Sequence, residues 1–239
     1  LLSTLTIGVI VYALIEAPDA GWTSTQTLGL FAAGIVSLAA FIGWERRTPE
    51  PMLDVNIFRN LRFSAASLSV TVAFFALAGF IFLITQYFQF LKGYGPLETG
   101  FRLLPVATSV AISSIVGTQL AVRYGTKFIV GGGLVTLSVA YGWISTSGVD
   151  TSYLEIACQM IFLGTGMGLT SAPATESIMG AVSNAKAGIG SAVNDTTREL
   201  GGTLGVAVIG SVFASLYQDA FKVDSVREIP AAALGPAQE

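Results

Sequence analysis

The run from Asn194 to Glu199 brings an amide, two carboxylates and a guanidinium together, directly before an apolar stretch that ends near Tyr217. Asp195 and Glu199 are four residues apart and share a helix face, and Arg198 is three residues from Asp195 and can bridge to it. Charged groups within a membrane are costly unless they pair or face a water-filled cavity. Asp195, Arg198 and Glu199 are therefore interpreted either as a gate or coupling network, or as a structural lock at a helix end.

Amide side chains are the second group that could contact a substrate. Gln86 and Gln89 lie three residues apart late in a long apolar stretch, with Tyr87 between them. Buried amides cost free energy unless they are hydrogen-bonded, so these groups are expected to face a neighbouring helix or a cavity. With Asn194 they form the candidate lining of a substrate cavity, and interhelical hydrogen bonding is the alternative.

A turn that carries two cations, between Gly117 and Lys127, joins two further apolar stretches. Arg123 and Lys127 place positive charge there, which the C-terminus of a helix favours. Such a loop can hold neighbouring helices in one conformation of a transporter and release them in another. Gly117, Arg123, Gly125 and Lys127 are therefore candidates for a cytoplasmic latch, and a simple positively charged anchor is the alternative.

The overall composition excludes several kinds of chemistry. Of the 239 residues, 52% are hydrophobic and only 11% are charged, whereas a soluble domain carries about 25% charged residues. The net charge of −3 gives no electrostatic case for nucleic-acid binding. The sequence has no histidine, and its single Cys158 permits neither an internal disulfide nor a zinc framework. We expect no enzyme, no cofactor and no metal site, but an all-α bundle that lies in the lipid bilayer.

The elements that must position these side chains are apolar stretches long enough to cross a membrane, which takes about 20 residues as a helix. The sequence predicts seven, at residues 1–15, 25–44, 63–91, 101–121, 128–146, 153–175 and 189–217. Pro105 and Pro173 lie inside two of them and are expected to kink the helices. Glycines in 164–168 and 201–205 have a spacing that allows close helix packing.

The links between the stretches divide the chain and orient it. The longest link, residues 46–62, separates a leading helix pair (1–45) from a bundle (63–217), which a polar tail (218–239) follows. Basic residues in short loops accumulate on the cytoplasmic side of a membrane. The side richer in them carries Arg46, Arg47, Arg59, Arg62, Arg123, Lys127 and Lys186. We therefore expect this side, with residue 1, to be cytoplasmic and the tail to lie outside.

Several motifs resemble one branch of a known family. Residues 172–180, 190–198 and 201–207 resemble the late helices of the fourteen-helix drug:proton antiporters of the major facilitator superfamily, and so do the link 44–60 and the segment 86–105. The resemblance implies that residues 1–45 are the helix pair between two six-helix bundles and that 63–217 supply five helices of the second bundle. Residues 117–127 resemble the second copy of the family's cytoplasmic loop motif, with Val122 where an acidic residue is usual.

The resemblance also implies a function. It indicates a multi-pass protein of the cell membrane that exports drugs or small metabolites, coupled to protons, by alternating access. Residue 1 is Leu and the number of stretches is odd, so we expect a fragment of a transporter. Its partners would be a small-molecule substrate, protons, the lipid bilayer and the N-terminal bundle of the same chain. A membrane scaffold or accessory subunit that does not transport is the alternative.

Overall fold

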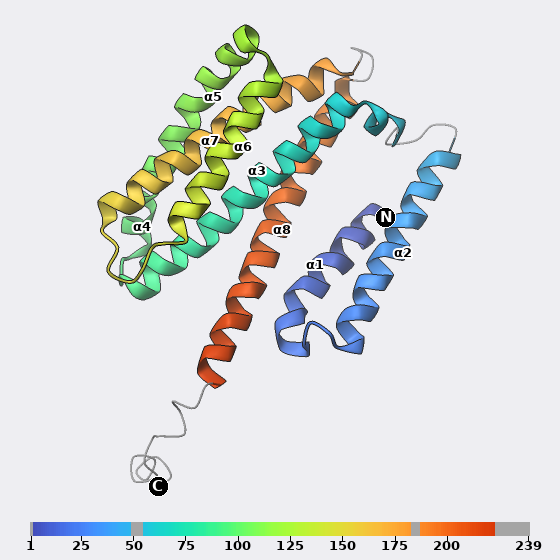
Figure 1. Ribbon diagram of the computed structural model, residues 1–239. Coiled ribbons are helices and arrows are strands. Elements are labelled where there is room, and N and C mark those ends of the chain that lie inside the picture. Colours follow the sequence, from blue (N-terminus) through green and yellow to red (C-terminus); the bar gives the residue numbers. More distant parts are fainter. Residues whose placement is uncertain (1, 49–54, 183–186, 223–239) are drawn as a thin grey trace. The chain divides into compact units, whose positions relative to one another are not determined.

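The computed structural model describes residues 2–48, 55–182 and 187–222, and every regular element within these ranges is helical (Figure 1). The elements are α1 (Leu2–Ala20), α2 (Thr25–Arg47), η1 (Val55–Arg59), α3 (Leu61–Gln86), η2 (Tyr87–Leu91), α4 (Pro96–Arg102), α5 (Leu104–Tyr124), α6 (Thr126–Ile144), α7 (Tyr153–Gly180) and α8 (Ala187–Lys222). The middle of the predicted link 46–62, Lys186 and the tail beyond residue 222 lie outside the described residues.

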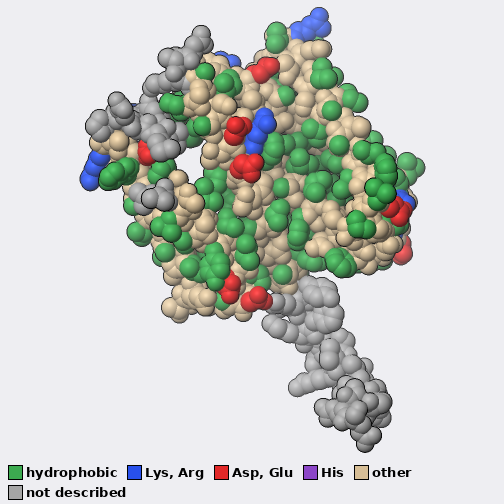
Figure 2. All heavy atoms as spheres, turned by 180° about the vertical axis from the view of Figure 1, so that it is seen from behind, with side chains coloured by type: hydrophobic (Ala, Val, Ile, Leu, Met, Phe, Trp, Pro, Cys, Tyr) green, Lys and Arg blue, Asp and Glu red, His purple; other side chains and the backbone are tan. Residues whose placement is uncertain are grey.

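Within the described ranges, six helical segments are long and apolar enough to cross a membrane. They are Ser3–Ala20, Thr25–Arg47, Leu61–Leu91, Pro96–Tyr124, Thr126–Ile144 and Ala187–Leu216. Hydrophobic side chains cover much of the face shown in Figure 2, where charged groups are few. Such a surface suits hydrocarbon and not water. The prediction of an all-α membrane protein is confirmed.

The seventh predicted stretch, 153–175, forms α7, which is long enough to span but is not among these six segments. Its sequence is rich in glycine, serine and threonine, and most of its central residues are buried. The helix contacts α5, α6 and α3 within the compact unit Ala39–Val206. Because its neighbours shield it, α7 does not need the apolar surface that a lipid-facing helix requires.

Glycines let the helices around α7 approach closely. A Cβ on Gly168 would lie 2.6 Å from the carbonyl oxygen of Val110 on α5, and one on Gly164 would lie 2.7 Å from that of Val106. On the other side, a Cβ on Gly166 would lie 2.7 Å from the backbone nitrogen of Leu137 on α6. These distances are shorter than Cβ contacts allow, so residues 164–168 pack backbone against backbone, as their spacing predicts.

The second compact unit contains α1, the start of α2 to Leu38, and α8 from Ala207 onward. Thr6 Oγ1 and Ser37 Oγ, 2.8 Å apart, hydrogen-bond α1 to α2. The helix α1 continues through Pro18 to Ala20, beyond the predicted end at residue 15. Pro18 cannot donate a backbone hydrogen bond.

The prolines of the two bundle helices behave differently from each other. Pro173 lies inside α7, as predicted. Pro105 lies inside the spanning segment Pro96–Tyr124, as predicted, and the helix is interrupted two residues before it, at Leu103, between α4 and α5. Pro105 then occupies the first turn of α5, where a missing N–H costs nothing.

Candidate functional site

A shallow, open groove of about 480 Å³ runs along α3, and Val206 of α8 borders it on one side. Its lining residues are Phe74, Leu77, Ala78, Ile81, Phe82, Thr85, Gln86 and Val206. The members on α3 recur every three or four residues, so they occupy one face of that helix. Mostly apolar walls with a few polar groups are typical of small-molecule sites. Of the predicted cavity residues, Gln86 lies in this groove.

Two glycines of α8 position the wall of the groove. A Cβ on Gly205 would lie 3.0 Å from the Cα of Phe75, and one on Gly201 would lie 3.1 Å from the Cβ of Phe74. Only a residue without a side chain allows α8 to approach α3 this closely. The glycines of residues 201–205 therefore have the packing role that their spacing predicts, and the groove borders a fixed helix pair.

Tyr87 and Gln89, the other predicted cavity residues on this segment, belong to the short π-helical turn η2. Both side chains are partly buried, and neither lines the groove. The hydroxyl of Tyr87 donates to the carbonyl of Gly148 over 3.0 Å, and Lys92 Nζ donates to that of Val149 over 2.8 Å. These contacts attach the end of α3 to the loop before α7.

Asn194 is buried and belongs to a polar cluster with Thr175, Arg198 and Phe74, which we call the Arg198 cluster. The hydroxyl of Thr175 on α7 donates to Asn194 Oδ1 over 3.0 Å. Arg198 Nη2 in turn donates to the same hydroxyl over 3.0 Å, and the guanidinium lies 5.2 Å from the ring centroid of Phe74. Since Phe74 also lines the groove, the cluster and the groove share a residue.

The bridge from Arg198 to Asp195 does not form. Asp195 and Glu199 are exposed, and from the described residues Asp195 accepts one long hydrogen bond, 3.4 Å, from Asn194 Nδ2. Arg198 instead extends toward α7 and α3, where a hydroxyl and an aromatic face receive it. Partly buried hydrogen bonds and ring contacts outweigh a surface ion pair, which is worth at most about 1 kcal/mol. The three predicted gate residues are therefore neighbours on α8, but Arg198 faces away from both carboxylates.

The predicted latch residues lie on both sides of the turn between α5 and α6, with Gly117 and Arg123 on α5 and Lys127 in the first turn of α6. Gly125 has a φ of 93°, which favours glycine, and it ends α5 and precedes α6. Arg123 and Lys127 are exposed beside it. Gly117 is buried two turns earlier in α5, where a Cβ would lie 3.1 Å from the Cα of Leu169 on α7. The structure thus separates a packing glycine, Gly117, from a charged surface turn.

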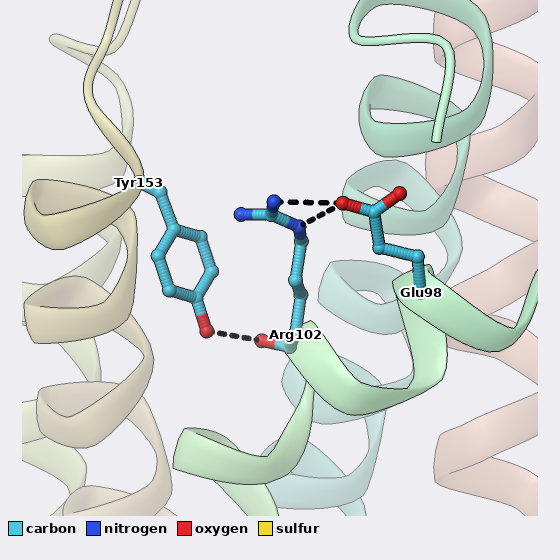
Figure 3. A network of polar contacts seen from close by, with 3 residues as sticks. All are labelled: Glu98, Arg102 and Tyr153. Atoms are coloured by element: carbon cyan, nitrogen blue, oxygen red, sulfur yellow. Dashed lines mark hydrogen bonds and ion pairs between the residues drawn. The ribbon is translucent and has the colours of Figure 1, made fainter. Parts of the chain in front are cut away.

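A second polar cluster, around Arg102, was not predicted from the sequence (Figure 3). Arg102 Nη2 lies 2.7 Å from Glu98 Oε1, and the guanidinium lies 3.9 Å from the ring centroid of Tyr94 and 4.7 Å from that of Tyr153. The hydroxyl of Tyr153 donates to the carbonyl of Arg102 over 3.2 Å. The spacing of Glu98 and Arg102 indicates their pairing, but no local signal brings in Tyr153 from α7.

The long apolar helices, their packed glycines and the groove beside them define a multi-pass membrane protein of the helical-bundle kind. Residues 1–206 match the family model of the Major Facilitator Superfamily. The chain belongs to this family of membrane transporters, which is not a family of enzymes.

Several curated relatives are similar over nearly the whole chain. The multidrug resistance protein Stp of Mycobacterium tuberculosis is 34% identical over 230 residues, which are 96% of this chain and 43% of the relative. The multidrug efflux pump LfrA of Mycolicibacterium smegmatis is 32% identical over 91% of this chain and 43% of its own length. The tetracenomycin C resistance and export protein of Streptomyces glaucescens is 30% identical, over 89% and 39%. The chain thus spans less than half the length of these relatives.

Proposed function

We propose that the protein to which this chain belongs exports lipophilic small molecules across the cell membrane by alternating access, in exchange for protons. Three relatives that match most of the chain are described as a multidrug resistance, an efflux and an export protein. In transporters of this kind, the substrate site lies between two bundles near the middle of the membrane. This chain would supply part of the second bundle, and the remaining length of such a protein would supply the first.

The observation that carries the proposal is the groove on α3. Its walls are apolar, and its polar groups, Thr85 and Gln86, lie at one end. Apolar walls can bind many lipophilic compounds by burial alone, while an amide orients those that offer a hydrogen-bond partner. We assign Gln86 to substrate contact, with Tyr87 and Gln89 beside it at the end of α3 and Asn194 in the Arg198 cluster at Phe74.

Charged residues would control the change between the inward-open and outward-open conformations of alternating access. We propose that Asp195, Arg198 and Glu199 form a gate, in which the exposed carboxylates meet the other bundle and Arg198 holds the contact to α7. Gly117, Arg123, Gly125 and Lys127 would form a latch, with the two exposed cations pairing across to acidic groups of that bundle. The exposure of Asp195 and Glu199 on α8 and of Arg123 and Lys127 beside the α5–α6 turn supports these roles, because exposed charges are available to a partner.

Efflux of Nile red, an uncharged lipophilic dye, tests the proposal in cells that produce the full-length protein and lack their own pumps. We expect energised cells to lose the dye faster than vector controls, and a protonophore to remove the difference. The variant Gln86→Ala should slow efflux, whereas Gln119→Ala, at an exposed site on α5, should not. Efflux equal to that of the vector control would contradict export and favour a membrane scaffold.

A further inference from the structure

The guanidinium of Arg198 has no anionic partner among the described residues. No carboxylate oxygen of a described residue lies within 4.0 Å of it. Its Nε is buried and makes no hydrogen bond to a described residue. Its contacts are a neutral hydroxyl and an aromatic ring. An arginine cannot lose its proton to avoid this situation, so the positive charge remains.

The acidic groups on the packed elements are directed elsewhere. On α8, Asp195 and Glu199 are exposed. On α7, Glu176 is exposed, and Glu155 accepts a hydrogen bond from Trp143 near the opposite end of that helix. The sequence of α3 contains no carboxylate at all. A cation within a membrane span without a counter-charge indicates a site for an anion.

Arg198 does not line the groove itself, but its guanidinium lies 5.2 Å from the ring centroid of Phe74, which does. Phe74 lies beneath Arg198 and also forms one end of the groove, which continues along α3 to Gln86. Phe74 and Gln86 are twelve residues apart, which corresponds to about 18 Å along the helix. A ligand that places its apolar body between Leu77 and Phe82 would therefore bring a group at its end toward Arg198. Charge complementarity at this end favours an anionic group.

We infer that the groove takes an amphipathic carboxylate, whose apolar body lies along α3 and whose carboxylate pairs with Arg198. This inference rests on the proposed export function and names the class of substrate. Arginine suits the role because its planar guanidinium presents several donors to a carboxylate at once. Thr175 is a positioning residue, since its hydroxyl holds Nη2 and is itself oriented by Asn194.

Binding of two matched probes tests the inference on purified full-length protein in lipid nanodiscs. The probes are 1-pyrenebutyrate and 1-pyrenebutanol, which share their apolar body and differ in the carboxylate. Binding is measured by fluorescence anisotropy, with empty nanodiscs subtracted. We expect the wild-type protein to bind the carboxylate about tenfold more tightly than the alcohol, the size of one charge-assisted hydrogen bond. Arg198→Gln should abolish this preference.

The variant Arg62→Gln is the matched control, because it removes an exposed cation at the start of α3 that contacts Ser177 and does not line the groove. It should keep the full preference for the carboxylate. If Arg198→Gln does not elute as a folded protein, Arg198→Lys is used instead. This variant keeps the positive charge but loses the planar set of donors, so the preference for the carboxylate probe should fall. An unchanged preference in that case would overturn the inference.

Two further results would also overturn it: equal affinity of the wild-type protein for both probes, and a preference that survives Arg198→Gln. The second would mean that another group of the protein, and not Arg198, binds the carboxylate. Neither result affects the export proposal, because Nile red is uncharged and its efflux does not depend on an anion site. Conversely, if Nile red is not exported but the protein still prefers the carboxylate probe in an Arg198-dependent way, the proposed export of neutral compounds is rejected and the anion site stands.

Discussion

Pro18 leaves the carbonyl oxygen of Leu14 without the backbone N–H that an α-helix would supply four residues later. Ser211 takes over this contact, since its hydroxyl donates to that oxygen over 2.5 Å. Ser211 is buried. A buried carbonyl without a partner costs free energy, and in a membrane no water can compensate. The serine therefore makes it possible for α1 to continue past its proline.

Replacement of Ser211 by alanine should lower the free energy of unfolding by about 1 kcal/mol, because the carbonyl of Leu14 loses its donor. In a Pro18→Ala background the same replacement should cost much less, because residue 18 then supplies the N–H itself. Reversible unfolding of the full-length protein in mixed micelles measures this double-mutant cycle.

Ser138→Ala is the control, since Ser138 is exposed and bonds only to a carbonyl of its own helix. It should change the free energy of unfolding by a few tenths of a kcal/mol at most. Equal costs of Ser211→Ala with and without Pro18 would show that the serine does not replace the missing backbone donor.

The helix α7 depends on glycine where it meets its neighbours, and Gly168→Ala tests this dependence. The new Cβ would lie 2.6 Å from the backbone oxygen of Val110, which a side-chain rotation cannot relieve. We expect a loss of about 1–3 kcal/mol in the free energy of unfolding. Gly132→Ala is the matched control on α6, because no atom lies within 4 Å of its Cβ position.

In the control the helix propensity of alanine is the main effect, so Gly132→Ala should be neutral or stabilising by up to about 1 kcal/mol. Chemical unfolding of both variants gives the comparison. A similar cost at the two sites would mean that close packing does not limit residue 168.

The helices themselves can be predicted from the sequence, because the length of an apolar stretch is a local property that determines whether it can span the membrane. Their boundaries follow less well. The break at Leu103 depends on the preference of Pro105 for a first helical turn, and α1 passes Pro18 because Ser211, far away in sequence, supplies a donor. Gln86 was found by type and position, since an amide in an apolar stretch is unusual. The sequence did not predict that Arg198 contacts Thr175 instead of Asp195, because this contact depends on α7 packing beside α8.

The orientation of the whole chain in the membrane can be tested with cysteine. In a background with Cys158 and any other cysteine of the full-length protein replaced by serine, Asp150→Cys should react with a membrane-impermeant maleimide added to intact cells. Tyr124→Cys should react only after the cells are opened. Both sites are exposed at helix-connecting turns, and the excess of basic residues near Tyr124 predicts that its side is cytoplasmic.

Labelling of both variants after cell lysis shows that each site is reactive. The reverse pattern in intact cells would place the latch turn outside the cell and remove the basis for a cytoplasmic latch.

Insertion into the bilayer puts a particular demand on α7. Glycine, serine and threonine gain little free energy from entering hydrocarbon, and α7 packs residues of these types against α5 and α6. During biosynthesis α5 and α6 leave the ribosome before α7, so they can already be in the membrane when α7 is inserted. Assembly of this bundle would then be sequential, with α7 stabilised in the membrane by its neighbours as well as by lipid.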